Sequence, residues 1–135
     1  MIASQVRNKM KAPLDGVKVL DMGAFGVGPV SCALLGLMGA EVIRVEPPTG
    51  DGLMFTGTKI GGMGTSYIVA HFNKKNIVLN LRKEADKEIA FKLVAWADIM
   101  VENRRLRTMK NLGFDYDSML KFNPNIIYIS SPAYG

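Results

Sequence analysis

The residues best suited to chemistry begin with a glycine-rich stretch, Gly23 to Gly28, placed between a short apolar run and Pro29. A glycine turn between a strand and a helix lets the backbone approach a ligand, and the helix N-terminus favours an anion. The order G-x-x-G-x-G departs from the dinucleotide fingerprint G-x-G-x-x-G. Glu46 ends the next apolar run, where such enzymes hold a ribose. Two interpretations stay open: a weakened nicotinamide-dinucleotide site, or a tight turn that only allows close packing.

Basic residues form a second candidate feature, because the net charge of +5 is concentrated in two places. Residues 1–12 contain three basic residues and residues 103–112 contain four, and neither segment contains an acid. They are Arg7, Lys9, Lys11, Arg104, Arg105, Arg107 and Lys110. We expect residues 1–12 to form a flexible basic arm. The second segment suits a small anionic ligand better than a nucleic acid, the alternative being a solvated basic loop.

Cysteine and histidine content excludes several chemistries. The one cysteine, Cys32, cannot form an internal disulfide or a multi-cysteine metal site, and the one histidine, His71, makes a histidine-rich metal site improbable. Cys32 lies in an apolar segment and is expected in the core, and His71 is expected to be a hydrogen-bonded, non-catalytic residue of a helix. We expect no metal, no permanently bound cofactor and no catalytic residue within this chain.

Hydrophobic patterning predicts the elements that position these residues. Runs rich in Val and Ile predict strands over 17–21, 41–46, 77–79, 99–101 and 126–129. Helices are expected over 30–38, with Pro29 at the first position, and over 66–72, 84–97, 105–111 and 115–121, the last capped by Asp115. Residues 49–66 are expected to form a long loop. This alternation predicts an α/β fold with a mainly parallel sheet covered by helices.

The carboxyl ends of the predicted strands bring two arginines to one edge. Arg82 follows the third strand and Arg104 follows the fourth, and ligands collect at this edge of a parallel sheet. Guanidinium groups there can bind phosphate oxygens in pairs. Lys74 precedes the third strand and is expected to lie in a solvated turn. The residues alone therefore predict an α/β domain with a phosphate-bearing ligand.

Blocks spread along the chain resemble the class III CoA-transferases, the family of formyl-CoA transferase and carnitine CoA-transferase. They include PLDGVKVLD at 13–21, GP at 28–29, GAEVIRVEPP at 39–48 and NKKNIVLNL at 73–81. Shorter matches follow in order at 97–98, 102–103, 112–116 and 123–128. Each block is short, but their order and spacing together are specific.

The resemblance implies a Rossmann-like, CoA-binding N-terminal region over residues 13–135, an incomplete part of a larger fold. Carried over onto this sequence, the residues that bind CoA are Gly26, Val27, Leu79, Asn80, Leu81, Arg82, Asn103, Arg104 and Arg105. Two departures concern this site. Asn80 stands where the family usually has Asp, and R-R-L-R at 104–107 replaces the common F-R-P-G.

The resemblance also implies a function. Family members move CoA between carboxylic acids through a mixed anhydride on an aspartate that lies beyond position 135. We therefore expect the N-terminal part of a longer, cytoplasmic transferase, inactive alone, whose full-length form is an interlocked homodimer. Its partners would be CoA thioesters and a small carboxylic acid, with no nucleic acid and no membrane. The alternatives are a 2-methylacyl-CoA racemase or epimerase of the same family, or a non-catalytic CoA-binding module.

Overall fold

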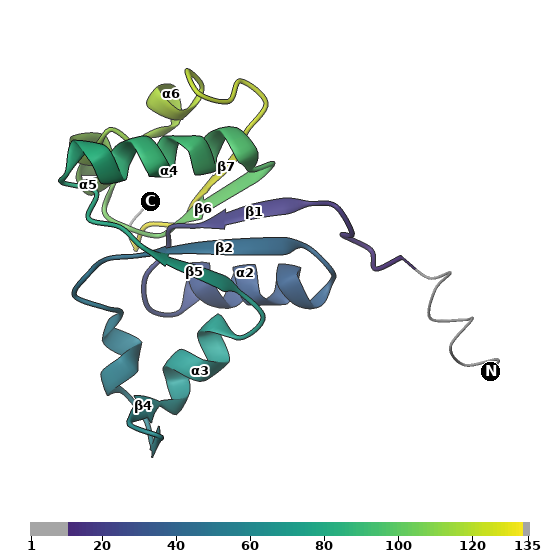
Figure 1. The fold of residues 1–135 in the computed structure, drawn as a ribbon, viewed down its shortest axis with the longest axis vertical. Helices are drawn as coiled ribbons and strands as arrows, with labels where there is room; N and C mark the ends of the chain where they lie inside the picture. The colour runs from purple at the N-terminus through teal and green to yellow at the C-terminus, as the bar shows by residue number, and fades with distance from the viewer. Residues whose placement is uncertain (1–10, 134–135) are drawn as a thin grey trace.

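Five parallel strands form the central sheet of the computed structural model, which describes residues 11–133 (Figure 1). They are β1 (Lys18–Asp21), β2 (Glu41–Glu46), β5 (Lys75–Val78), β6 (Ile99–Glu102) and β7 (Ile127–Ser130), and their order in the sheet is β5-β2-β1-β6-β7. All four neighbouring pairs are parallel. The predicted α/β fold with a parallel sheet is confirmed. Strands rich in Val and Ile suit such a sheet because both of its faces can be covered.

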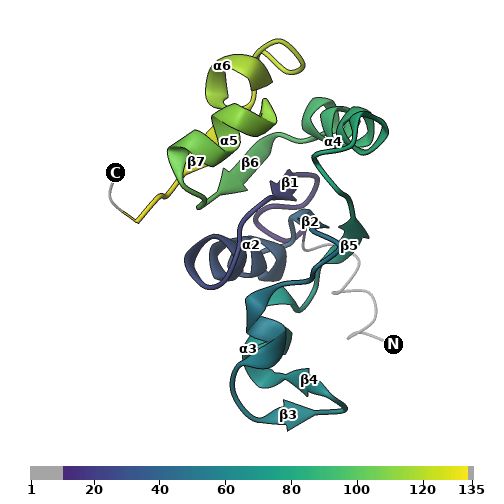
Figure 2. The same cartoon turned by 90° about the vertical axis from the view of Figure 1, so that its left-hand side faces the viewer.

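Helices cover the two faces of the sheet in separate groups (Figure 2). On one face lie α2 (Val27–Leu37) and α3 (Thr65–His71), and on the other lie α4 (Glu84–Trp96), α5 (Leu106–Leu112) and α6 (Tyr116–Met119). The chain adds β2 and β5 on one side of β1, then crosses over to add β6 and β7 on the other. The direction of winding therefore reverses between β1 and β6, which is where open α/β sheets form their ligand crevice.

Two hydrophobic clusters form the core, one on each face of the sheet. The larger lies between the sheet and α4–α6 and includes Leu20, Met100 and Phe114. The smaller lies between the sheet and α2 and includes Val19 and Cys32. Cys32 is fully buried, as predicted, and this burial raises the pKa of its thiol to about 12. It is a packing residue, because a nucleophilic cysteine needs a lowered pKa.

Two local predictions were wrong in detail. Helix α2 begins at Val27, so Pro29 is its third residue. This position is tolerated because the N–H groups of the first turn have no partner within the helix. Residues 49–66 are not a structureless loop. They hold a 3₁₀ helix, η1 (Gly52–Phe55), and an antiparallel hairpin of β3 (Lys59–Ile60) and β4 (Met63–Gly64). Gly61 and Gly62, with φ of 58° and 83°, make its turn.

Two helix ends agree with the sequence. Gly113 closes α5 with a φ of 80°, and the Asp115 carboxylate accepts the Ser118 N–H at the start of α6. Within residues 11–133 no helix has both the length and the apolar character needed to cross a membrane. Most of the expected N-terminal arm, residues 1–10, lies outside the described residues.

Candidate functional site

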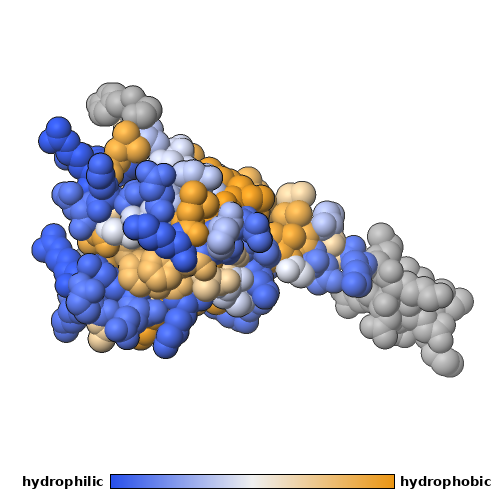
Figure 3. All heavy atoms as spheres, turned by 90° about the horizontal axis from the view of Figure 1, so that it is seen from above, coloured by the Kyte–Doolittle hydropathy of each residue, from blue (hydrophilic) through white to orange (hydrophobic). Residues whose placement is uncertain are grey.

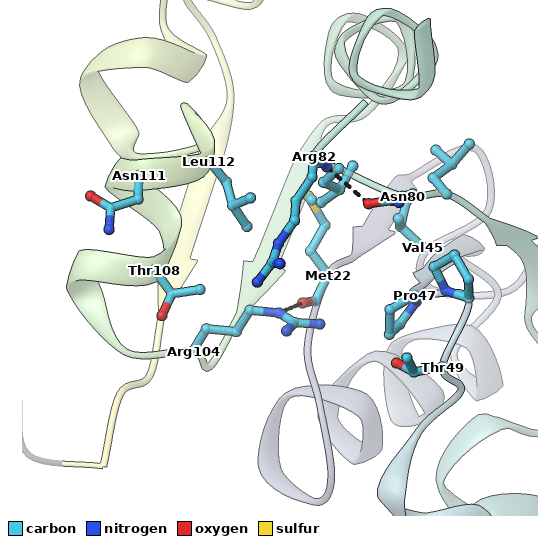
Figure 4. A pocket seen from close by; sticks show the side chains of 13 residues that line it. Met22, Val45, Pro47, Thr49, Asn80, Arg82, Arg104, Thr108, Asn111 and Leu112 are labelled. Atoms are coloured by element: carbon cyan, nitrogen blue, oxygen red, sulfur yellow. Dashed lines mark hydrogen bonds between the residues drawn. The ribbon is translucent and has the colours of Figure 1, made fainter. Parts of the chain in front are cut away.

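An open pocket of about 740 Å³ lies at the carboxyl edge of the sheet, beside the point where the winding reverses (Figure 4). Segments after β1, β2, β5 and β6 line it, together with α5. The lining residues are Met22, Val45, Pro47, Pro48, Thr49, Leu79, Asn80, Leu81, Arg82, Arg104, Thr108, Asn111 and Leu112. The volume falls in the range of small-molecule sites, and apolar walls with a few polar groups are typical of them.

Two arginines give the pocket its charge. Arg82 is exposed, and its backbone N–H donates to Asn80 Oδ1 at 3.1 Å. Arg104 is partly buried, and its Nε donates to the Met22 carbonyl at 3.3 Å. Burial, followed by the charge of Arg44, lowers the pKa of the Arg104 guanidinium, although an arginine stays protonated in proteins. Figure 4 shows the two side chains pointing into the same space, an arrangement that favours an anion.

The wider surface agrees with this location. Figure 3 shows hydrophilic side chains gathered at the left-hand end of the molecule, which is the end of the strand arrowheads in Figure 1. Arg105 and Arg107 are exposed beside this edge, at the start of α5. The pocket is therefore open to solvent beside further basic groups.

The residues predicted to bind a ligand fall into two groups. The pocket brings together five of them: Leu79, Asn80, Leu81, Arg82 and Arg104. The other four do not line it. Gly26 and Val27 are exposed at the N-terminus of α2, Arg105 is exposed before α5, and the Asn103 side chain is bonded to Ala24.

The three glycines after β1 differ in how closely other atoms pack against them. A Cβ at Gly23 or Gly28 would lie 3.2 or 3.4 Å from Asn103 Oδ1, so both glycines allow close packing against that side chain. A Cβ at Gly26 would meet nothing within 4 Å. The interpretation of the stretch as a close-packed turn therefore holds at Gly23 and Gly28. Gly26 faces open space.

A network of buried charged side chains lies under this turn. Arg44 Nη2 donates to Asp51 Oδ2 at 2.6 Å, and its Nη1 lies 3.7 Å from Asp21 Oδ2. Lys74 Nζ donates to Asp21 Oδ2 at 2.7 Å and to the Pro29 carbonyl at 2.6 Å. The prediction that Lys74 is solvated was wrong, because its side chain is only 1% exposed. Sequence reasoning missed the network, although a charge inside the apolar strand EVIRVE was its signal.

His71 belongs to the same network. Its Nδ1 lies 3.4 Å from Lys74 Nζ, and its Nε2 lies 3.6 Å from Asp51 Oδ2. An ammonium group only donates, so Nδ1 accepts and the proton of the neutral ring is on Nε2. Nε2 is buried without a hydrogen-bond partner in the part of the chain described, which corrects the expectation of a fully hydrogen-bonded histidine. Burial, then the charges of Arg44 and Lys74, lower the pKa of His71 to about 4.

Two acids that end strands are engaged within the protein. Glu46 Oε2 accepts from the Tyr67 hydroxyl at 2.7 Å, from Asn76 Nδ2 at 3.1 Å and from Arg44 Nε at 3.4 Å. Burial and the bond to Glu46 raise the pKa of Tyr67 to about 12. The Glu102 carboxylate accepts from the Arg104 backbone N–H and the Ser130 hydroxyl. The dinucleotide interpretation thus loses its ribose-binding acid.

Comparison with known proteins settles the family. Residues 14–135 match the model of CoA-transferase family III. The chain belongs to CoA-transferase family III. Two relatives are an acetyl-CoA:oxalate CoA-transferase from Acetobacter aceti, 38% identical, and a formyl-CoA:oxalate CoA-transferase from Streptomyces avermitilis, 35% identical. The alignments cover 94% and 93% of this chain but 33% and 31% of those proteins. This family III chain therefore spans about a third of the length of these relatives.

A solved structure confirms the fold of this family III region. A CAIB/BAIF family protein from Brucella suis superimposes with a TM-score of 0.81 at 34% sequence identity, covering 90% of this chain and 33% of that one. The Rossmann-like topology expected from the sequence is therefore shared with that region of a larger protein.

Proposed function

We propose that this family III region provides much of the CoA-binding site of an enzyme that moves CoA between carboxylic acids. The observation that carries the proposal is the pair Arg82 and Arg104, which point into one open pocket at the carboxyl edge of the sheet. The pocket lies where parallel α/β sheets bind ligands, within the residues matched by the family.

The chemistry of the pocket fits the nucleotide end of CoA. Arg82 and Arg104 offer guanidinium donors to the 3′-phosphate or the diphosphate, and such charge-assisted bonds are among the strong ones. Pro47, Leu81 and Leu112, which line the pocket and are partly exposed, supply apolar surface against which an adenine ring can pack. The exposed Arg105 extends the positive charge outside the pocket.

The transfer step is proposed from the relatives. Their names describe exchange of CoA between acids, which favours a transferase over a racemase. In the proposed reaction an aspartate carboxylate attacks the thioester carbonyl, an acyl–aspartyl mixed anhydride forms, and the C–S bond breaks to release CoA as its thiolate. The CoA thiolate then attacks the aspartyl carbonyl, which releases the donor acid as its carboxylate and leaves CoA in thioester linkage to the aspartate. The acceptor carboxylate attacks this thioester and forms a second mixed anhydride, with CoA leaving as thiolate. The thiolate finally attacks the acceptor carbonyl, which yields the acceptor's CoA thioester and restores the aspartate carboxylate.

We propose that this aspartate lies outside this chain, as the family resemblance implies. The buried acids near the pocket are held by cations or donors: Asp21 by Lys74, Asp51 by Arg44, and Glu46 by Tyr67. These three acids are engaged within the fold. The chain alone is therefore proposed to bind CoA without catalysing transfer, and the full-length protein to act as an interlocked homodimer on CoA thioesters and a small carboxylic acid.

Titration calorimetry with CoA and dephospho-CoA tests the binding proposal. We expect CoA to bind more tightly, because the arginines of the pocket favour a concentrated anion. Equal affinities would mean that the pocket does not bind the 3′-phosphate of CoA. Absence of binding by a folded chain would overturn the proposed function, and thioester exchange by this chain, with an acyl group trapped by hydroxylamine, would overturn the placement of the aspartate.

A further inference from the structure

We propose that Asn103 is a positioning residue, which holds the turn between β1 and α2 in its binding shape and does not itself contact the ligand. This inference rests on the proposed CoA site, because that turn carries Gly26 and Val27. It changes the role of a residue that the family resemblance places among the CoA contacts.

Both ends of the Asn103 carboxamide are bonded to one residue of the turn. The Ala24 N–H donates to Asn103 Oδ1 at 2.7 Å, and Asn103 Nδ2 donates to the Ala24 carbonyl at 2.8 Å. The two residues are 79 positions apart in the chain. A carboxamide combines a donor and an acceptor in one rigid plane, so it can hold both backbone groups of a residue at once. The two bonds also fix which end of the amide is oxygen.

The turn is built to admit this side chain. Gly23 and Gly28 stand on either side of it, and a Cβ on either one would lie within 3.4 Å of Asn103 Oδ1. Gly23 is also restricted by Pro29, whose Cδ would be 2.8 Å from such a Cβ. The absence of side chains at Gly23 and Gly28 is therefore explained by the position of Asn103.

Phe25, the residue after Ala24, has an unfavourable backbone conformation that the surrounding contacts must stabilise. Phe25 has a φ of 57°, in the left-handed region that a bulky residue seldom occupies. Its N–H donates to Asp51 Oδ2 at 3.3 Å. The residue is 57% exposed, and its ring lies against Gly52, where an added Cβ would be 2.5 Å from Phe25 Cζ. Asn103 holds Ala24, and Asp51 accepts the N–H of Phe25. Together these contacts fix the direction in which the chain reaches Gly26, the residue before α2.

The same loop connects this turn to the pocket. Asn103 comes directly before Arg104, whose Nε is bonded to the Met22 carbonyl on the pocket wall. A single two-residue segment after β6 therefore holds the backbone after β1 at Met22 and at Ala24. Breaking the Asn103 bonds to Ala24 therefore shifts Gly26 and Val27 relative to Arg82 and Arg104. The Asn103 carboxamide acts in this way without bonding the ligand.

The test combines amide hydrogen exchange of the ligand-free chain with CoA affinity. Two variants are compared with wild type: Asn103→Ala, which removes both bonds, and Asn103→Asp, which keeps the shape and the acceptor but removes the donor. Asn125→Ala is the matched control, because Asn125 is exposed in the turn before β7. We expect both Asn103 variants to exchange faster over residues 24–28 while the sheet stays protected. We also expect CoA affinity to fall about tenfold.

Other outcomes separate the two proposals. A fall in affinity without faster exchange over residues 24–28 would mean direct contact with CoA and would overturn the positioning role. Faster exchange with unchanged affinity would overturn it as well, because the turn would then lie outside the site. Wild-type protection and affinity in both Asn103→Ala and Asn103→Asp would also overturn the positioning role. If wild type does not bind CoA, the proposed function fails, while the exchange data still decide whether Asn103 holds the turn.

Discussion

Lys74 Nζ lies 2.7 Å from Asp21 Oδ2, and these two side chains are 1% and 0% exposed. They belong to a closed circuit of buried contacts that runs from Asp21 through Lys74, His71, Asp51 and Arg44 back to Asp21. The circuit joins β1, β2 and α3 beneath the turn that precedes α2. Its charged side chains are paired and buried, so removing one partner leaves another uncompensated.

Lys74→Ala is expected to destabilise the fold strongly. Breaking a buried ion pair costs about 3–5 kcal/mol, because the remaining carboxylate stays buried without its partner. Lys75→Ala is the matched control, because its partner Glu41 is 2.5 Å away but the two side chains are 72% and 43% exposed. An exposed pair of this kind contributes less than about 1 kcal/mol. Urea unfolding measures both variants, and equal losses would contradict the burial of Lys74.

His71 is expected to make stability depend on pH on the acid side of neutrality. The pKa of His71 is about 4 in the folded chain, against 6.5 for an ordinary histidine side chain, so the unfolded chain binds more protons between these two values. Stability from this group is therefore complete above pH 6.5 and is lost as the pH falls towards 4, with a slope of up to about 1.4 kcal/mol per pH unit. His71→Asn, which keeps an acceptor for Lys74, should flatten this part of the profile. Urea unfolding from pH 7 to 4.5 measures it, and identical slopes in both proteins would refute the assignment.

Arg82→Ala is expected to weaken CoA binding about tenfold to a hundredfold, since a charged hydrogen bond to phosphate is worth about 1.5–3 kcal/mol. Lys92→Ala is the control, because it removes one positive charge from the exposed side of α4. Lys74→Ala is unsuitable for this comparison, because Lys74 is part of the buried circuit. Calorimetry measures the affinities, and equal effects of Arg82→Ala and Lys92→Ala would mean that Arg82 acts only through net charge.

The isolated chain is expected to self-associate. Leu34 and Leu37 are 55% and 59% exposed on α2, and Val30 of the same helix is 40% exposed. Contiguous apolar surface of this kind drives association. Sedimentation velocity should show species larger than a monomer that decrease in Leu34→Gln/Leu37→Gln. Ile89→Gln, an exposed apolar residue of α4, should have little effect. A monomer at every concentration, melting cooperatively, would contradict the prediction.

The sequence by itself determined the order of the strands of the central sheet and of the main helices, and the segments that build the pocket. Alternating apolar runs and helical spacing depend on neighbouring residues, and parallel strands bring their carboxyl ends to one edge. This is why Arg82 and Arg104 could be placed together from the pattern. The helix ends at Gly113 and Asp115 could also be predicted from the sequence, because a helix cap involves residues only a few positions apart.

Only the tertiary structure decided which polar groups are buried and what holds them. Lys74 meets Asp21 across 53 positions of the chain, and Asn103 meets Ala24 across 79. No local pattern records such a distance, so a basic residue in a turn looks the same whether it is solvated or enclosed. A buried charge becomes stable only when its partner arrives from another element, and that arrangement exists only once β1, β2, β6 and α3 have packed together.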